Sequence, residues 1–310
     1  MSNEYLLSLV IPTNGVKEWV LPVLKSIYSQ KVDERLFEVV VTDNGDSDEF
    51  YELMQNYCLV HSNFIYNRTE SKLFLNQIDG FKLANGRLIK FVNHRFKLKP
   101  GALEYLIDFS RKNFTSSPIT YFLNGATDVA EKKYIISSFD SFMYGLKNYS
   151  SWSGGICCWK KDLEKILSND TISNLFPHIV FITYYDSNRI YKIDNEPLFE
   201  EISSGAKKKG NYDLFYAFGV EYVELIKELK NQELIDSITE TFILKENEKF
   251  LAKMYLFYIV MKKESSYNFE TVDTSLNRYY SLLRIRVLAY LEAVGVVWKK
   301  FLRNKKHEKK

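Results

Sequence analysis

The chain of 310 residues has few of the residues that interrupt or cross-link a fold, with 13 glycines, 6 prolines and 3 cysteines. Intrinsic disorder, a collagen-like repeat and a disulfide scaffold are therefore poor descriptions of it. Its 46% hydrophobic and 26% charged residues are typical of a globular protein. The length suits about two domains, or one large α/β domain with an appendage.

Signals for secretion and for membrane insertion are also missing. The N-terminus has neither the basic segment nor the cleavage site of a signal peptide. The longest apolar stretches, 250–261 and 287–298, each contain a charged residue and are too short to span a bilayer. Cys58, Cys157 and Cys158 show no zinc-ligand spacing, which favours reduced thiols. We expect a cytoplasmic protein, soluble or peripheral on the inner face of the plasma membrane.

Charge of one sign gathers only at the C-terminus. Residues 299–310 contain seven lysines and arginines against one glutamate, so they carry +6 of a net charge of +3, and the rest of the chain carries −3. The acidic body argues against nucleic-acid binding, and the basic tail favours an anionic membrane surface. An interfacial helix and an ordinary packing helix both remain open for 276–302. Its apolar residues near one face are Leu283, Val287, Leu291, Val294, Trp298 and Phe301.

Strand-like and helix-like segments alternate over the first 125 residues. Their periodicity predicts strands at 6–11, 37–42, 64–67, 87–92 and 120–123, and helices at 17–30, 48–57, 73–84 and 100–112. This alternation predicts an α/β fold with a mostly parallel sheet and helices on both faces. We expect one domain over 1–211 and a helical region over 212–310, with helices at 212–229, 233–263 and 276–302.

Polar segments directly follow three of the predicted strands, namely Pro12–Gly15, Asp43–Asp46 and Asn93–Arg95. Because ligands bind beyond the carboxyl ends of parallel strands, we expect these segments to line one binding edge. GxGxxG after a strand, GxxxxGK[ST], HExxH and GxSxG are all missing. The usual dinucleotide and phosphate loops, zinc-protease sites and serine-hydrolase sites are therefore excluded.

Four motifs in order resemble the family 2 glycosyltransferases, whose nucleotide-sugar-binding fold is called GT-A. They are LSLVIPTNG, FEVVVTDNGDSD, the stretch from Asn76 to ANGRLI, and KLKPGALEYL. The resemblance covers about residues 5–110 and continues to the glycine pair at 154–155. It implies a GT-A-like catalytic domain that binds a nucleotide-diphosphate sugar, with a UDP-type donor expected.

The resemblance also implies a donor site. Asp43 matches the residue that accepts the imide N–H of a uracil-type base, although a turn-forming role is the alternative. Helix capping remains open for Thr13 and Asn14, and a solvated charge for Lys72 and Arg68. The residues that we expect to bind the nucleotide sugar are Pro12, Thr13, Asn14, Asp43, Asn44, Lys72, Asn93 and Arg95.

The sequence departs from the family at the metal motif. Asn93 and Arg95 stand where the family has the Asp-x-Asp carboxylates that hold Mg²⁺ or Mn²⁺. Arg95 either binds the diphosphate itself, or the site is inactive, or the segment is a solvated turn. We favour a functional Arg95 and disfavour a metal cofactor, with Asp46 or Asp128 as alternative cation ligands. His94 is expected to be structural.

Acceptor-side residues follow from the same resemblance. His178 and Asp186 fall where the family places the base that deprotonates the acceptor hydroxyl, with a packed histidine as the alternative. Trp152, Gly154 and Gly155 match a glycine loop near the acceptor. Stacking on sugars and burial are both open for Trp152 and Trp159.

We therefore expect a glycosyltransferase that extends a surface glycan or a lipid-linked acceptor, such as a capsule or O-antigen precursor. The alternative is an inactive family member that serves as a binding subunit of a polysaccharide assembly complex. A nucleotidyltransferase is disfavoured by the missing glycine–lysine signatures.

Overall fold

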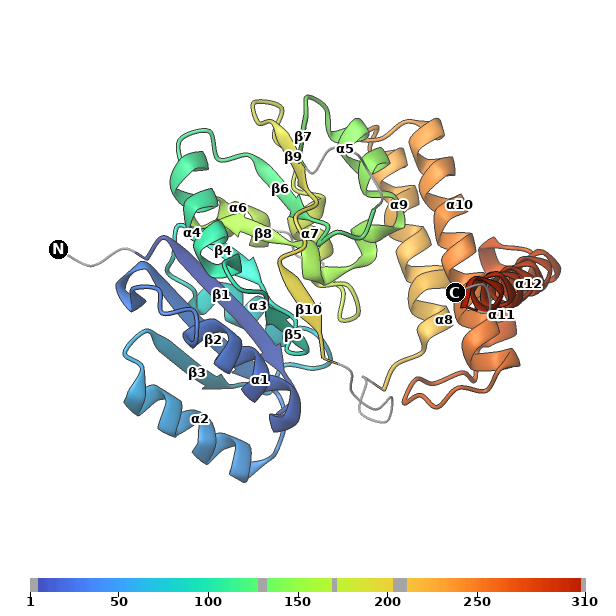
Figure 1. Cartoon of the computed structure of the whole chain (residues 1–310). Coiled ribbons are helices and arrows are strands. Elements are labelled where there is room, and N and C mark those ends of the chain that lie inside the picture. Colours follow the sequence, from blue (N-terminus) through green and yellow to red (C-terminus); the bar gives the residue numbers. More distant parts are fainter. Residues whose placement is uncertain (1–4, 128–132, 169–171, 203–210, 308–310) are drawn as a thin grey trace. The chain divides into compact units, whose positions relative to one another are not determined.

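The computed structural model describes residues 5–127, 133–168, 172–202 and 211–307, with backbone only for 133, 134 and 295–307 (Figure 1). The chain divides into two compact units, Met1–Ser204 and Gly205–Lys310. The strands of the first unit are β1 (Leu7–Thr13), β2 (Phe37–Asp43), β3 (Phe64–Arg68), β4 (Leu88–Phe91), β5 (Phe96–Leu98), β6 (Ile119–Phe122), β7 (Lys133–Ile136), β8 (Cys157–Trp159), β9 (Tyr191–Asp194) and β10 (Phe199–Glu201). Its helices are α1 (Lys17–Tyr28), α2 (Asp48–Val60), α3 (Asn76–Leu83), α4 (Ala102–Asn113), α5 (Phe139–Leu146), α6 (Leu163–Leu167) and α7 (Ile179–Ile182).

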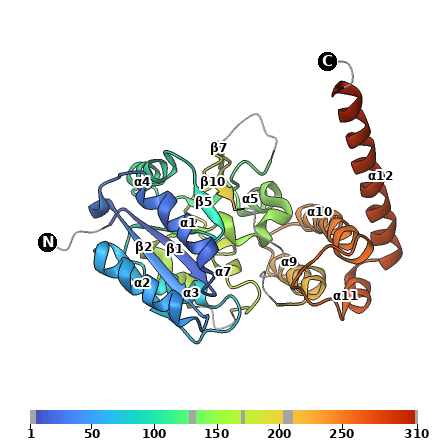
Figure 2. The same cartoon turned by 60° about the horizontal axis from the view of Figure 1, so that its bottom comes forward.

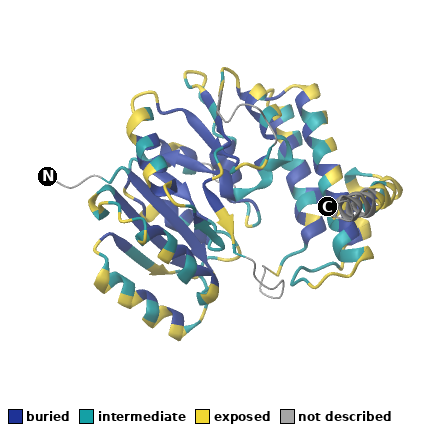
Figure 3. Cartoon of the chain, viewed as in Figure 1, coloured by how far each residue is buried: buried dark blue, intermediate teal, exposed yellow. Residues whose placement is uncertain are grey.

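The main sheet has the strand order β3-β2-β1-β4-β8, in which only β8 runs antiparallel to its neighbour. Every residue of β1, β2 and β4 is buried, as Figure 3 shows, and this explains why these strands are near-continuous apolar runs. Helices cover both faces. Leu7, Leu9 and Ile11 pack in one core with α1 and α4, whereas the neighbouring Val10 lies against Gly80 of α3. The predicted mostly parallel α/β sheet is confirmed.

A second sheet has the order β6-β9-β7, with β6 parallel to β9. A bridge joins Tyr121 of β6 antiparallel to Ile156, the residue before β8. Because β8 is antiparallel to both β4 and β6, the carboxyl ends of β1, β2, β4, β6 and β9 all point to one side. We call this side the carboxyl edge and the opposite side the amino edge.

The second unit is helical. It contains α8 (Leu214–Tyr216), α9 (Tyr222–Asn231), α10 (Ser237–Met254), α11 (Val272–Tyr279) and α12 (Leu282–His307), with π-helical turns at Ala217–Glu221 and Tyr255–Val260. Its core includes Phe215, Leu251, Leu276 and Ile285. Figure 2 shows that α12 extends beyond α10 and α11. None of the described helices combines the length and apolar character that a membrane crossing requires.

Candidate functional site

The three polar segments predicted to share one edge do meet at the carboxyl edge. The Thr13 carbonyl accepts hydrogen bonds from the Asn44 backbone at 3.1 Å and from the Asn76 side chain at 3.0 Å. The Thr13 hydroxyl lies 2.9 Å from Nδ1 of His94. Thr13, which ends β1, therefore joins the loops after β2 and β4, and its own side chain is used in building the site.

Asp43 ends β2 and is fully buried. One carboxylate oxygen accepts the Gly45 amide and the other accepts the Tyr66 hydroxyl, both at 2.8 Å. Burial raises the pKa of Asp43, and these two bonds oppose the rise. The Gly45 contact is the turn-forming role left open above. Because none of the Asp43 side chain is exposed, a uracil-type nucleobase reaches its remaining lone pairs only if one of the flanking loops moves.

Close backbone approach fixes the loop after β2. A side chain on Gly45 would overlap the Asn14 carbonyl, so glycine is required there. Asn44 uses its side-chain amide to donate to the carbonyls of Ser71 and Leu73, both at 2.9 Å, which orders the loop before α3. That loop carries the exposed Lys72. The side chain of Asn14 is also exposed, whereas Pro12 is buried within β1.

Arg95 lies at the same edge, and its guanidinium packs over the ring of Trp19, a contact that was not predicted from the sequence. Its guanidinium carbon lies 5.4 Å from the centre of the Trp19 ring, and Nη1 lies 3.8 Å from Oε1 of Glu201. Trp19 also packs against His94 with ring centres 5.0 Å apart. Burial and Arg95 lower the pKa of His94 to about 3, so this ring is neutral and structural. Trp19 lies in the first turn of α1, directly after the Thr13 loop, and this position in the chain was the only feature of the sequence that could have predicted the contact.

The residues at the family's metal position do not suit a divalent cation. Asn93 accepts the Arg95 amide with its side-chain oxygen at 3.0 Å, and Arg95 brings a positive charge. Within the described ranges, no three histidine, cysteine, aspartate or glutamate side chains group closely enough to hold a metal. Asp128 lies outside the described residues. A cation would therefore meet repulsion instead of ligands at this position.

The glycine loop is closely packed against aromatic rings. A side chain on Gly154 would overlap Trp152, and one on Gly155 would overlap Tyr121, so packing explains both glycines. Trp152 is half-buried and faces Phe96 of β5 at 6.1 Å. Trp159 is buried and donates its indole N–H to the Pro118 carbonyl at 2.9 Å, so the suggestion that it stacks on sugars is wrong.

His178 directly precedes α7 and is 4% exposed. Its Nε2 lies 3.1 Å from the Ser151 carbonyl, which only accepts, so Nε2 carries the proton. Burial lowers the pKa of His178 to about 4, so the ring is neutral at physiological pH. Nδ1 is then a bare lone pair, and it has no hydrogen-bond partner among the described residues.

Asp186 lies at the amino edge of the sheet, away from the predicted site at the carboxyl edge. It precedes β9, and Arg189 beside it donates to the Ser117 carbonyl just before β6. The start of β9 and the Ser117 carbonyl both lie at the amino edge, opposite Asp43. Arg189 also pairs with the buried Asp162 at 2.7 Å. Oδ2 of Asp186 lies 3.8 Å from Nε of Arg189, so Asp186 belongs to this ion cluster, and its predicted role as a base is not supported.

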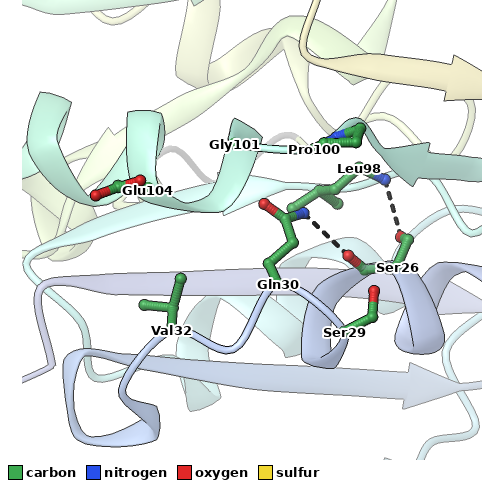
Figure 4. Close-up of a pocket in the computed structure, with 8 residues that line it drawn as sticks. All are labelled: Ser26, Ser29, Gln30, Val32, Leu98, Pro100, Gly101 and Glu104. Carbon is green, nitrogen blue, oxygen red and sulfur yellow. Dashed lines mark hydrogen bonds between the residues drawn. The ribbon is translucent and has the colours of Figure 1, made fainter.

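A cavity of about 330 Å³ lies away from this edge (Figure 4). It sits at the last turn of α1, about 18 Å along the helix from the Thr13 loop at 1.5 Å per residue. Hydrogen bonds from Gln30 and Leu98 to Ser26 form part of its wall. The residues that line it are Ser26, Ser29, Gln30, Val32, Leu98, Pro100, Gly101 and Glu104.

The mostly parallel sheet, with helices on both faces and polar loops at its carboxyl edge, has a GT-A-like fold. Residues 8–160 match the sequence profile described as Glycosyl transferase family 2. This part of the chain is therefore a family 2 glycosyltransferase domain. No curated protein gives a significant sequence match.

Solved structures similar in fold include TarS from S. aureus. The alignment has 15% identity and a TM-score of 0.50, and covers 82% of this chain and 43% of that protein. S. aureus TarS 1–349 in complex with UDP has 15% identity and a TM-score of 0.51, with coverage of 83% and 75%. This chain thus spans less than half the length of full TarS. At these identities the likeness concerns the fold.

Proposed function

We propose that the chain transfers a sugar from a UDP-type nucleotide sugar to a hydroxyl of a surface glycan or lipid-linked acceptor. The observation that carries this proposal is the meeting of the loops after β1, β2 and β4 around buried Asp43, within a family 2 domain. The complex of S. aureus TarS 1–349 with UDP supports the choice of donor. In this proposal the surrounding donor residues are Asn14, Lys72 and Arg95.

Arg95 takes the place of a metal in this proposal. Its side chain is 17% exposed at the carboxyl edge, and a guanidinium forms bidentate bonds with a diphosphate. As the bond between the anomeric carbon and the diphosphate breaks, UDP departs with the electron pair, and a positioned cation stabilises the negative charge that grows on it. The proposed reaction is therefore independent of divalent metal.

His178 is the proposed base. The acceptor hydroxyl loses its proton as it attacks the anomeric carbon, and Nδ1 of His178 offers a lone pair that has no partner among the described residues. Burial lowers the pKa of this ring to about 4, which makes it a weak base. Hydrogen bonds and chain neighbours connect His178 to the donor loops. Its hydrogen-bond partner Ser151 directly precedes Trp152 of the glycine loop. The carbonyl of Asn174, shortly before His178 in the chain, accepts a hydrogen bond from the Phe74 amide in the loop that carries Lys72.

One observation favours a second candidate, an inactive member that binds nucleotide sugars within an assembly complex. Asn93 and Arg95 replace both carboxylates of the family's metal motif. Titration calorimetry with UDP tests nucleotide binding, which both candidates require. Turnover of UDP-glucose, UDP-galactose and UDP-N-acetylglucosamine with octyl glycosides as soluble acceptors then separates them, because only the transferase releases UDP in an acceptor-dependent manner.

The second unit is proposed to rest on an anionic membrane, which places the enzyme at the cytoplasmic surface. Leu283, Val287, Leu291 and Val294 are exposed along α12, opposite the buried Ile285 and Ala289. Lys299, Lys300, Arg303, Lys305 and Lys306 follow on the same helix, and nothing is described of their side chains. Truncation before Lys299 should weaken binding to anionic liposomes, since each basic residue contributes about 1 kcal/mol near such a surface. Full-length protein that ignores these liposomes at low salt rules the proposal out.

A further inference from the structure

A lysine is buried inside the main sheet, where an apolar residue is expected. Lys90 lies in β4, three residues before Asn93, and is fully buried. Its ammonium nitrogen donates to the carbonyls of Gly154 at 2.7 Å, Phe91 at 2.8 Å and Ile156 at 3.2 Å. A lysine ammonium has three donors, so each finds an acceptor.

The Lys90 ammonium group is surrounded by carbonyl oxygens and aromatic rings and has no carboxylate counterion among the described residues. The rings of Phe122 and Phe199 lie 5.4 Å and 5.3 Å from the ammonium nitrogen. Among the described residues, no carboxylate forms an ion pair with Lys90. Burying a lysine is unfavourable unless its donors are satisfied, so the three carbonyls explain why this residue is tolerated.

Two of the three acceptors flank Gly155, and this determines what the lysine does. Gly154 and Ile156 belong to the glycine loop, whereas Phe91 ends β4 just before the Asn93–Arg95 segment. We propose that the Lys90 ammonium is a positioning group that fixes the glycine loop to the end of β4, and so sets the place of the acceptor beside the donor loops. This inference rests on the proposed function, in which the glycine loop receives the acceptor.

Protonation gives the inference a distinctive readout. Burial lowers the pKa of Lys90 to about 7. The titratable group that faces it is the Cys157 thiol of β8, whose pKa burial raises to about 12. Asp194 of β9, which interacts with Cys157, is itself bonded by the Tyr105 hydroxyl at 2.6 Å. Above pH 7 the neutral amine has two N–H groups for three carbonyls, so the glycine loop is held less firmly.

Lys90→Met removes the donors and keeps much of the volume. The control is Lys160→Met, because Lys160 follows β8 and donates to a single carbonyl, that of Ala84. We expect Lys90→Met to raise the KM for the octyl glycoside acceptor about tenfold while the Kd for UDP is unchanged. The wild-type KM should rise above pH 7, and that of Lys90→Met should not. Equal KM values in the two variants would overturn the inference.

Hydrogen exchange tests the same inference without turnover. Amides 153–157 should exchange faster in Lys90→Met than in the wild type, with those of β1 and β2 unchanged. If the variant does not fold, the wild type at pH 6.5 and 8.5 replaces it, after correction for intrinsic exchange, and protection of 153–157 should fall at the higher pH. Constant protection overturns the role of Lys90. Absence of UDP binding in the wild type overturns the proposed function alone.

Discussion

The two edges of the sheet in the first unit treat their polar groups differently. At the amino edge, the buried Glu38 accepts hydrogen bonds from the Ser8 hydroxyl and from the amides of Asn85 and Gly86. At the carboxyl edge, Nδ1 of His178 has no partner among the described residues, and Arg95 meets Glu201 only at 3.8 Å. Satisfied groups stabilise a fold, whereas unsatisfied buried groups require another explanation, such as a ligand. This difference agrees with the proposed function, in which the carboxyl edge binds the donor and the acceptor.

The strongest test of this comparison concerns His178. His178→Gln keeps a donor for the Ser151 carbonyl and removes the lone pair at Nδ1. Because general bases contribute about 100- to 10,000-fold, we expect kcat to fall by that range with unchanged UDP affinity. Steady-state UDP release and titration calorimetry measure the two quantities. Wild-type turnover in this variant contradicts the assignment.

Arg95 is expected to have the next largest effect. Arg95→Ala should lower kcat roughly 100- to 1,000-fold, as loss of a group that stabilises transition-state charge does. Arg95→Lys should recover part of the activity, because a point charge cannot form the bidentate pair. Wild-type turnover in excess EDTA should persist. Activity that disappears with EDTA and returns with Mn²⁺ shows that a metal site exists elsewhere.

Asp43 is expected to serve both in building the loop after β2 and in binding the donor. Asp43→Ala should weaken UDP binding by about 1–3 kcal/mol, because a hydrogen bond to a charged acceptor is lost. Ser8→Ala at the amino edge is the control, since it removes one bond to Glu38 and should lower only stability. Equal UDP affinity in folded Asp43→Ala and wild type would show that Asp43 has a structural role alone.

Acid should destabilise the carboxyl edge. The folded pKa of His178, about 4, lies below the value of about 6.5 expected in the unfolded chain. Between these values the unfolded chain binds more protons, so the free energy of unfolding falls as pH drops from 6.5 toward 4, by up to about 1.4 kcal/mol per pH unit. Urea unfolding at pH 7, 6 and 5 should give a shallower decline for His178→Gln. Identical slopes contradict the burial of a neutral ring.

The smallest expected effect concerns Glu201, which competes with the donor for Arg95. Glu201→Gln should tighten UDP binding about two- to fivefold, since exposed ion pairs are worth little. Glu200→Gln is a matched control, because the adjacent Glu200 pairs with Lys97 at 3.3 Å instead. Indistinguishable affinities in the two variants mean that Glu201 does not restrain Arg95.

Much of the first unit could be predicted from local pattern. The fully buried strands β1, β2 and β4 are apolar runs, and polar loops after them identified the binding edge. The strands β5, β7, β8 and β10, of three or four residues each, were missed because they form through long-range pairing and stand out little from the segments around them. The equally short β4 and β6 were predicted because each lies in a longer apolar run. Extended segments this short have no periodicity that distinguishes them from loops.

The site residues were less predictable than the fold. Asp186 was assigned to the site by its place along the chain, and only the parallel pairing of β9 with β6 places it at the amino edge. The reason for Gly154 and Gly155 also escaped the sequence, because the rings they contact belong to Trp152 and Tyr121. Lys90 was indistinguishable from a surface lysine until its three carbonyl acceptors were located.

The pairing of β5 with β10 has a consequence for biosynthesis. Phe199 aligns with Leu98 across about a hundred residues of chain, and β6 likewise depends on β9. During synthesis, the segment that matches the family 2 profile ends at residue 160 and is made well before β9 and β10. Until then β5 and β6 present unpaired edges, which are templates for aggregation. A recombinant fragment that ends at residue 160 should therefore be insoluble, whereas one that ends after β10 retains both partners.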